Sequence, residues 1–182
     1  SVKKYNGVKG TRPLPELDRG AALGAGTMGG GIAWLMAEAS MHPIMKDLTV
    51  EALNLGLKQS SQNFGGALKR KKITPDEFER KQRSITAQLD YSGFQKVDLV
   101  IEAVVENMDI KKKVLAETEK NVQRDCLLTS NTSSLSVEEM AKALELPGRF
   151  AGLHFFNPVH LMPLVEIVVH SKVDPETVEA LY

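Results

Sequence analysis

The chain alternates short apolar runs with longer segments in which apolar residues recur at helical spacing. The segment 32–39 repeats apolar residues at intervals of three and four, which is typical of one face of a helix. The run at 97–106 is instead rich in β-branched residues, as in a strand that is buried on both faces of a parallel sheet. This alternation predicts an α/β fold with a doubly wound, mostly parallel sheet in a single domain.

The other boundaries follow from the same patterns and from the proline, glycine and capping residues between them. We expect strands at 21–23, 43–47, 85–89, 97–106, 126–130, 150–156 and 164–169. We expect helices that end near 39, that cover 50–71, 74–84 and 109–122, and that begin at 136 and 174. Ser136 and Glu139 have the spacing of a capping box. A doubly wound sheet places its strands in the order 3-2-1-4-5-6 and binds ligands at their carboxyl ends.

The first loop at that edge, Gly-Ala-Gly-Thr-Met-Gly at 24–29, has the G-x-G-x-x-G pattern between a strand and a helix. Gly24 permits the tight turn, Gly26 lets the backbone approach a pyrophosphate, and Gly29 lets the helix pack closely on the strand. The helix amino terminus then offers N–H groups and a positive dipole end to a phosphate. Taken alone, the pattern also fits a simple glycine-rich turn. The predicted cofactor contacts in this loop are Gly24, Gly26, Thr27, Met28 and Gly29.

Asp47 ends the second predicted strand, 18 residues after Gly29. This is close to where a dinucleotide site places a carboxylate on the ribose hydroxyls of the adenosine half. The alternative is a turn or N-cap aspartate, although Thr49 could also cap the next helix. The basic run 69–72 is either a solvated helix end or a contact for an anionic substrate tail.

His154 ends the sixth predicted strand, and Glu166 lies on the next strand among apolar residues. Imidazole is a natural general base near neutral pH, and a carboxylate beside it would fix its tautomer and stabilise imidazolium. The spacing fits such a pair, and it fits equally well a structural histidine at a strand end and an exposed glutamate on an edge strand. Ser133 and Asn157 lie in loops at the same edge, where each could hold a substrate oxygen or a cofactor amide, or act only in a turn.

The charge and composition exclude several other classes of function. The 23 basic and 23 acidic residues balance, so the chain gives no electrostatic reason to expect nucleic acid or an anionic membrane as a partner. No apolar run approaches the roughly 20 residues that span a bilayer. Cys126 is the single cysteine and cannot form an internal disulfide, which fits a reducing compartment. No Cys/His group has the spacing of metal ligands, and we expect no metal site.

Four segments carry a family resemblance: GAGTMGGGIA, VIEAVVEN, SNTSSL and HFFNPVHLMPLVEI. They resemble the Rossmann-type NAD-binding domain of L-3-hydroxyacyl-CoA dehydrogenases, and the likeness extends over 19–182. The segments LDYSGF and KKKVLAETE are most similar to the α subunit of the bacterial fatty acid oxidation complex, a multifunctional enzyme. The resemblance implies NAD-dependent oxidation of L-3-hydroxyacyl-CoA to 3-ketoacyl-CoA in fatty acid β-oxidation.

The resemblance also implies a role for each site residue. His154 would take the proton of the 3-hydroxyl, Glu166 would orient His154, and Asp47 would bind the ribose diol and favour NAD over NADP. Met28 would lie on the pyrophosphate, and the basic run 69–72 would meet the phosphates of coenzyme A. Ser133 and Asn157 would lie near the nicotinamide and the reacting oxygen, and further cofactor contacts would be Val104, Val105, Glu106 and Lys111.

The resemblance implies an arrangement of domains as well. Residues 1–18 would be a linker or arm after a hydratase domain, and 19–182 would be the NAD-binding domain, without the helical domain that follows it in the family. We then expect weak to moderate NAD binding, little activity from this chain alone, and self-association of exposed apolar surface. The longer protein would assemble with a thiolase subunit in the bacterial cytoplasm. The alternatives are a non-catalytic NAD-binding module and a shortened stand-alone 3-hydroxybutyryl-CoA dehydrogenase.

Overall fold

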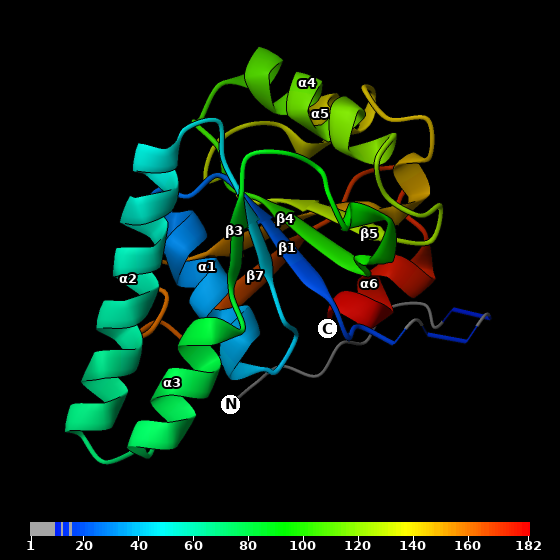
Figure 1. The fold of residues 1–182 in the computed structure, drawn as a ribbon. Coiled ribbons are helices and arrows are strands. Elements are labelled where there is room, and N and C mark those ends of the chain that lie inside the picture. The colour runs from blue at the N-terminus through cyan, green and yellow to red at the C-terminus, as the bar shows by residue number, and fades with distance from the viewer. Residues whose placement is uncertain (1–9, 12, 15) are drawn as a thin grey trace.

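One sheet organises the computed structural model, which describes residues 10–182 except 12 and 15 (Figure 1). Its strand order is β3-β2-β1-β4-β5-β6-β7, so the expected order is confirmed, and β7 adds an outer strand beside β6. The first six strands pair in parallel, and β7 pairs antiparallel to β6. The strands are β1 Gly20–Leu23, β2 Ile44–Lys46, β3 Thr86–Gln88, β4 Leu99–Glu102, β5 Leu127–Ser130, β6 Phe150–Phe155 and β7 Val165–Val168.

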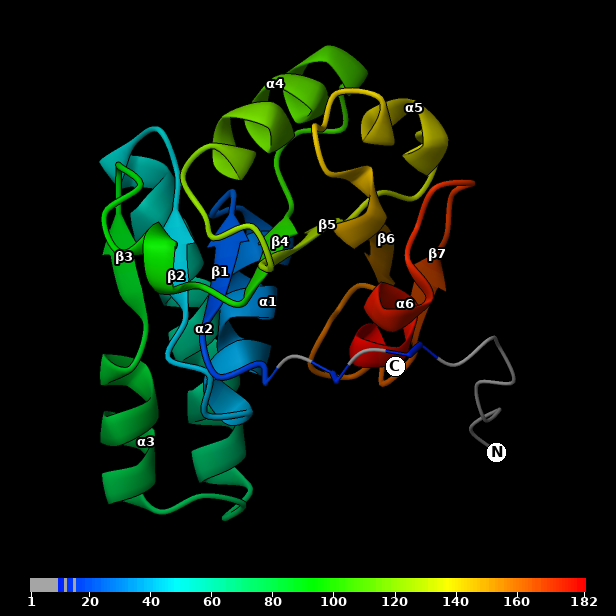
Figure 2. The same cartoon turned by 90° about the vertical axis from the view of Figure 1, so that its right-hand side faces the viewer.

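Helices cover both faces of this sheet, with α4 and α5 lying together and apart from α1 and α2 (Figure 2). The α-helices are α1 Thr27–Glu38, α2 Val50–Lys69, α3 Pro75–Arg83, α4 Met108–Glu119, α5 Val137–Ala141 and α6 Pro175–Leu181. Short 3₁₀ turns, η1 Phe94–Lys96 and η2 Pro147–Arg149, precede β4 and β6. The fold is therefore the doubly wound α/β arrangement that the sequence predicts.

The strand β4 explains why its sequence is an unbroken apolar run. Leu99 and Ile101 belong to the core on the side of α1 and α2, whereas Val100 belongs to the core on the side of α4 and α5. All three side chains are buried, because successive residues of a strand point to opposite faces and both faces are covered here.

Several predicted boundaries are wrong by a few residues. The strand predicted at 97–106 covers only Leu99–Glu102, because the chain leaves the sheet at its carboxyl edge and Asn107 caps α4 by accepting a hydrogen bond from the N–H of Ile110. The capping box predicted for α5 is half formed. Ser136 accepts from the N–H of Glu139, but the Glu139 carboxylate pairs with Lys112 and Lys142. The helix predicted at 50–71 ends at Lys69.

Side-chain caps fix where the two helices after β2 begin. Thr49 accepts a hydrogen bond from the N–H of Ala52 and starts α2. Thr74 and Glu77 form a complete capping box at the start of α3, and Pro75 follows the cap. Caps of this kind typically contribute about 1 kcal/mol each. The two helices run side by side beyond the sheet (Figure 1).

The predicted arm 1–18 is described only in part, and residues 1–9, 12 and 15 lie outside the described residues. The N–H groups of Gly10 and Thr11 donate to the carboxylates of Glu179 and Glu176 on α6. At the other end, the N–H of Asp18 donates to Asp98 just before β4. Among the described residues, no helix combines the length and apolar character that crossing a bilayer requires.

Candidate active site

Most candidate residues lie at the carboxyl ends of five neighbouring strands, β2, β1, β4, β5 and β6, or in the loops just beyond them, whereas Glu166 lies on β7 and Lys111 in α4. Direct contacts join these loops one to the next. The carbonyl of Leu23 accepts from the N–H of Ala103, and the carbonyl of Glu102 accepts from the N–H of Asn131. The Asn131 side chain in turn accepts a hydrogen bond from the N–H of Phe155. The edge is thus one continuous surface, as a doubly wound sheet requires for its ligand crevice.

The glycine turn has the geometry that each of its glycines predicts. Gly24 has a φ of 91°, and a Cβ on it would lie 2.7 Å from the carbonyl oxygen of Ala103. A Cβ on Gly29 would lie 1.7 Å from the carbonyl oxygen of Gly24, so the start of α1 packs on the turn itself. Gly26 is exposed, and a Cβ on it would meet nothing within 4 Å. The open space above Gly26 is where the pattern expects a pyrophosphate.

The amino terminus of α1 faces this space without a side-chain cap. The first N–H groups of a helix and its positive dipole end favour an anion at this place. Thr27 is exposed and Met28 is half-buried, both in the first turn. The structure therefore fits the phosphate part of a dinucleotide.

Asp47 lies against the glycine turn rather than on the helix that follows it. Its Oδ2 accepts a hydrogen bond of 2.6 Å from the N–H of Ala25, and its Oδ1 accepts one of 2.6 Å from the N–H of Leu48. Since Thr49 caps α2, the structure excludes the N-cap alternative for Asp47. The half-buried carboxylate is positioned between the turn and β2, where a ribose is expected.

Glu106 belongs to the second part of the edge, between the ends of β4 and β5. Its Oε1 accepts hydrogen bonds from the hydroxyls of Thr132 and Ser134 and from the N–H of Ser133. Partial burial opposes ionisation most strongly, but the Thr132 hydrogen bond, the charge of Lys111 and the backbone N–H groups together hold the pKa of Glu106 below its usual range. The Glu106 side chain remains 38% exposed, so a ligand can reach it.

Behind Glu106 lies a fully buried ion pair between Glu102 and Lys111, whose side chains are both 0% exposed. The Lys111 ammonium lies 2.8 and 3.1 Å from the two Glu102 oxygens and also donates to the carbonyls of Val104 and Asn131. Glu102 further accepts from the Ser130 hydroxyl and from the N–H of Val104. Burial raises the pKa of the Glu102 carboxyl, and the charge of Lys111 and these hydrogen bonds offset that effect in part.

This network was not predicted from the sequence. Lys111 is expected to contact the cofactor, but its side chain is buried and its ammonium faces protein oxygens. Glu102, Ser130 and Asn131 are absent from the predicted site. The available signal was a carboxylate inside the apolar run of β4, because a buried carboxylate needs a cationic or hydrogen-bonding partner.

His154 and Glu166 face each other across the antiparallel pair of β6 and β7, as predicted. They are cross-strand partners, and His154 Nδ1 lies 2.9 Å from Glu166 Oε2. Their side chains are 20% and 53% exposed, so the pair is open to solvent and ligand. Because Nδ1 faces the carboxylate, Nε2 is the nitrogen that can accept a proton from a bound molecule. The centroid of the Phe156 ring lies 4.5 Å from the centroid of the His154 imidazole ring.

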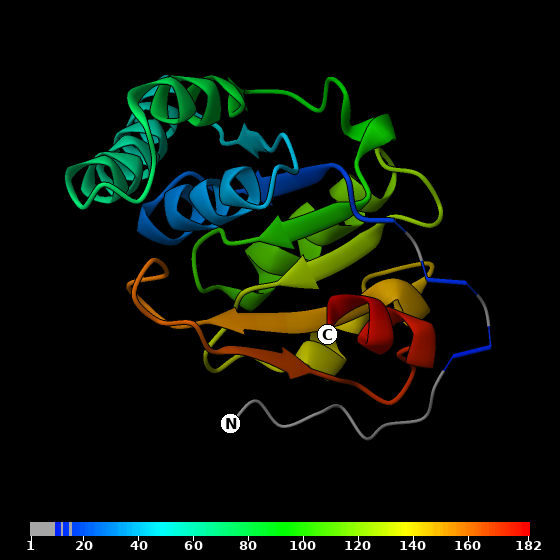
Figure 3. The same cartoon turned by 90° about the horizontal axis from the view of Figure 1, so that it is seen from below.

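The other predicted residues lie around these centres. Ser133 and Asn157 are exposed in the loops after β5 and β6, and Val105 is exposed after β4 next to half-buried Val104. The connection between β6 and β7 packs against α1 (Figure 3). The basic residues 69–72 are exposed at the turn between α2 and α3.

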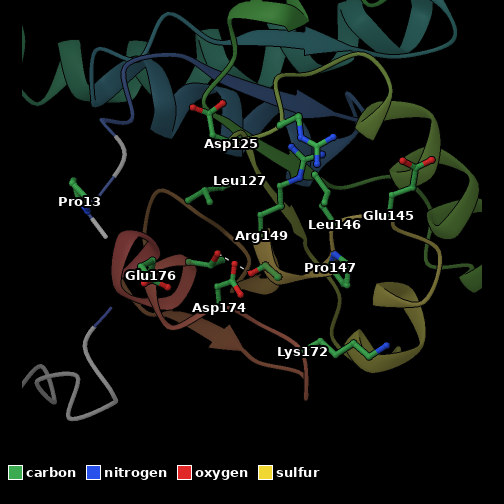
Figure 4. Close-up of a pocket in the computed structure, with 13 residues that line it drawn as sticks. Pro13, Asp125, Leu127, Glu145, Leu146, Pro147, Arg149, Lys172, Asp174 and Glu176 are labelled. Atoms are coloured by element: carbon green, nitrogen blue, oxygen red, sulfur yellow. Dashed lines mark hydrogen bonds between the residues drawn. The ribbon is translucent and has the colours of Figure 1, made fainter. Parts of the chain in front are cut away.

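A separate cavity of about 780 Å³ lies at the opposite edge of the sheet, near the amino ends of β5 and β6 (Figure 4). Asp125, Arg149, Lys172 and Asp174 are among its lining residues, and none of the predicted site residues lines it. Among the described residues, no group of three or more His, Cys, Asp or Glu side chains could hold a metal ion.

The chain is similar in sequence and in fold to known proteins. Residues 20–182 match the sequence model of the family described as 3-hydroxyacyl-CoA dehydrogenase, NAD binding domain. The 3-hydroxybutyryl-CoA dehydrogenase from Escherichia coli K12 is 35% identical, with a TM-score of 0.87 over 92% of this chain and 35% of its own. M. tuberculosis FadB2 is 34% identical, with a TM-score of 0.87 over 91% of this chain and 59% of its own.

A third similar structure belongs to a protein that is named as a multifunctional enzyme. The dehydrogenase part of multifunctional enzyme 1 from C. elegans is 25% identical, with a TM-score of 0.80 over 91% of this chain and 38% of its own. The chain thus spans between 35% and 59% of the length of the three solved chains.

Proposed function

The chain belongs to the 3-hydroxyacyl-CoA dehydrogenase family as its NAD-binding domain, and from this premise we propose that it supplies the NAD site and the catalytic pair for oxidation of L-3-hydroxyacyl-CoA to 3-ketoacyl-CoA. The observation that carries the proposal is the placement of His154 and Glu166 at the same sheet edge as the glycine turn. A dehydrogenase needs a base for the alcohol proton next to its cofactor site, and this edge offers both.

In the proposed reaction, His154 Nε2 takes the proton of the 3-hydroxyl as the carbonyl forms. NAD, when bound, supplies the hydride acceptor for carbon 3. Glu166 holds the other ring nitrogen at 2.9 Å, which fixes the tautomer and stabilises the imidazolium that results. Exposed Ser133 and Asn157 lie in the two adjacent loops, where each can donate a hydrogen bond to the reacting oxygen or the cofactor amide.

The cofactor assignment rests on the turn and on Asp47. The open space above Gly26 and the uncapped start of α1 suit a pyrophosphate, and the Asp47 carboxylate suits the two hydroxyls of a ribose. A phosphate on the ribose 2′ position would meet the negative charge of Asp47 directly. We therefore propose selectivity for NAD over NADP.

The basic residues 69–72 support a coenzyme A substrate. They lie exposed at the turn between α2 and α3, and α2 itself begins at the carboxyl edge, next to Asp47. The run itself lies at the far end of the 20-residue helix α2, about 30 Å from that edge, so it would meet the phosphates of a long, extended ligand whose reactive end lies at His154. Their attraction should weaken as salt rises.

The domain context remains a proposal as well. The likeness to the dehydrogenase part of a multifunctional enzyme supports such a context, whereas the likeness to E. coli 3-hydroxybutyryl-CoA dehydrogenase supports a single-activity alternative. The linker role of 1–18, assembly with a thiolase subunit, self-association and a bacterial cytoplasmic setting stay predictions.

Calorimetric titration of NAD and NADP tests the proposed function. Wild type should bind NAD and bind NADP more weakly, and Asp47→Ala should reduce the difference between the two cofactors because it removes the charge that repels the 2′-phosphate. Asp76→Ala, on exposed α3, is the matched control and should keep the wild-type preference. Equal affinity of wild type for NAD and NADP would overturn the role of Asp47, and no binding of NAD would overturn the proposal.

A further inference from the structure

Two ion pairs are buried in the part of the chain that the structure describes, and they lie at opposite edges of the sheet. Glu102 and Lys111 are both 0% exposed at the carboxyl ends of the strands. Glu119 and Arg149 are both 8% exposed and lie near the amino ends of β5 and β6. Only the first pair is next to the proposed active site, so the second provides a natural reference for the effect of burial alone.

The Lys111 ammonium binds the backbone of two loops of the proposed site. It donates to the carbonyl of Val104, 3.3 Å away in the loop that carries Glu106, and to the carbonyl of Asn131, 3.1 Å away in the loop that carries Ser133. An ammonium has three N–H groups, and these carbonyls and the Glu102 carboxylate together supply their acceptors. The ammonium therefore fixes the backbone of both loops from behind.

The same network reaches the catalytic histidine through Asn131. The backbone carbonyl of Asn131 binds Lys111, and its side-chain oxygen accepts a 3.0 Å hydrogen bond from the N–H of Phe155. Phe155 follows His154 directly at the end of β6. A shift of Asn131 would thus move the loop of Ser133 and the strand end that carries His154.

Glu102 holds this arrangement in place. It binds the Lys111 ammonium with both oxygens and also accepts from the Ser130 hydroxyl and the Val104 N–H. Its side chain is 0% exposed, so it touches no ligand itself. Without its charge, the buried ammonium would keep only the Glu106 carboxylate, whose Oε2 lies 3.5 Å away, and would have to move toward it, toward water or toward another acceptor.

We propose that Glu102 is a positioning residue that, through Lys111, fixes the half of the site that receives the nicotinamide end of NAD. This inference rests on the proposed function, because it assumes that NAD binds along the carboxyl edge. The half that receives the ADP portion is built from the glycine turn and Asp47, which make none of the Lys111 hydrogen bonds, although Gly24 packs against Ala103 at the start of the loop that Lys111 binds.

The test compares NAD with ADP as calorimetric probes, since ADP occupies only the half built by the turn and Asp47. In Glu102→Gln the dissociation constant for NAD should rise roughly tenfold, a typical coupling for a residue that acts through others, while that for ADP stays at the wild-type value. The matched control is Glu119→Gln, which breaks the other buried pair. It should lower thermal stability without changing the ratio of the two dissociation constants.

A second variant covers the case in which Glu102→Gln does not fold. The double variant Glu102→Leu with Lys111→Met replaces the pair by apolar side chains, which buried sites often tolerate. It should fold and bind ADP as tightly as wild type does. Its dissociation constant for NAD should rise by the same factor as in Glu102→Gln. Wild-type NAD-to-ADP ratios in both folded variants would overturn the positioning role and leave the proposed function intact. Failure of wild type to bind NAD would instead overturn the proposed function.

Discussion

The carboxyl edge of the sheet holds two acid–base pairs that are alike in composition and opposite in environment. Glu102 and Lys111 are completely buried, and their charges are surrounded by backbone carbonyls and a serine hydroxyl. His154 and Glu166 lie across an outer strand pair, with side chains 20% and 53% exposed. Both side chains of the buried pair are 0% exposed, so this pair is suited to holding structure. The exposed pair is open to solvent and to a ligand, so it is suited to proton transfer.

This contrast separates two demands on an active site. Chemistry needs a group whose protonation changes during the reaction, and such a group must reach substrate and solvent. Positioning needs a group whose state does not change, and burial provides this because moving it would leave a charge unsatisfied. Substitutions in the two pairs should therefore affect turnover and stability differently.

The largest effect is expected for His154→Gln. Loss of the general base should lower turnover of a 3-hydroxyacyl-CoA by about 10²–10⁴-fold, while NAD binding and thermal stability stay near wild type. NADH absorbance measures turnover. The assay uses either this chain or a longer form of the protein, whichever is active as wild type. His42→Gln, an exposed histidine near the start of β2, should be fully active. Retained turnover in His154→Gln would show that His154 is not the base and would favour the non-catalytic alternative for this site.

Next in size is the loss of stability in Lys111→Met. It leaves the Glu102 carboxylate buried without its cation, which should cost about 3–5 kcal/mol in the free energy of unfolding. Urea unfolding followed by circular dichroism measures this quantity. The neighbour Lys112, whose ion pair with Glu139 is partly exposed, gives the control Lys112→Met. Equal losses in the two variants would remove the distinction between buried and exposed pairs.

A smaller effect on stability is expected for Glu166→Gln. Because the carboxylate is 53% exposed, its pair with His154 should contribute less than about 1 kcal/mol to the free energy of unfolding. Turnover should nevertheless fall, since glutamine does not stabilise imidazolium. The comparison of urea midpoints with turnover in the same preparation measures both effects. A loss of stability as large as that of Lys111→Met would mean that the outer pair is structural.

The smallest effect concerns the acid side of the pH profile. The pKa of Glu106 is lowered in the folded state from an ordinary value of 4.5, so its contribution to stability is full above about pH 4.5 and is lost as pH falls through the folded pKa. Glu102, whose pKa is raised, works in the opposite direction, since its ionisation costs stability as pH rises above 4.5. Urea midpoints measured between about pH 3 and pH 6 should therefore fall less steeply with decreasing pH in Glu106→Gln than in wild type. An unchanged slope would contradict the role assigned to the hydrogen bonds on Glu106.

Local sequence patterns are enough to predict the sheet and the parts of the site that lie within single loops. The alternation of strands and helices predicts a parallel α/β sheet, and the doubly wound fold of this class has the strand order that is observed. The glycine turn and the place of Asp47 followed from the backbone requirements of a dinucleotide loop. The contact of His154 with Glu166 was one of two possibilities that the spacing left open, and the antiparallel pairing of β6 with β7 forms it.

Which charged groups are buried depends on the packing of elements that are distant in sequence. The sequence predicts Lys111 as a cofactor contact near the start of a helix, and it places Glu102 inside the predicted strand 97–106. Their contact with each other and with Asn131 joins three elements, so no spacing within one element reveals it. Burial depends on how α4 packs over the ends of β4 and β5. A buried charge gains a role from its surroundings, whereas a glycine turn has its role built into its own backbone.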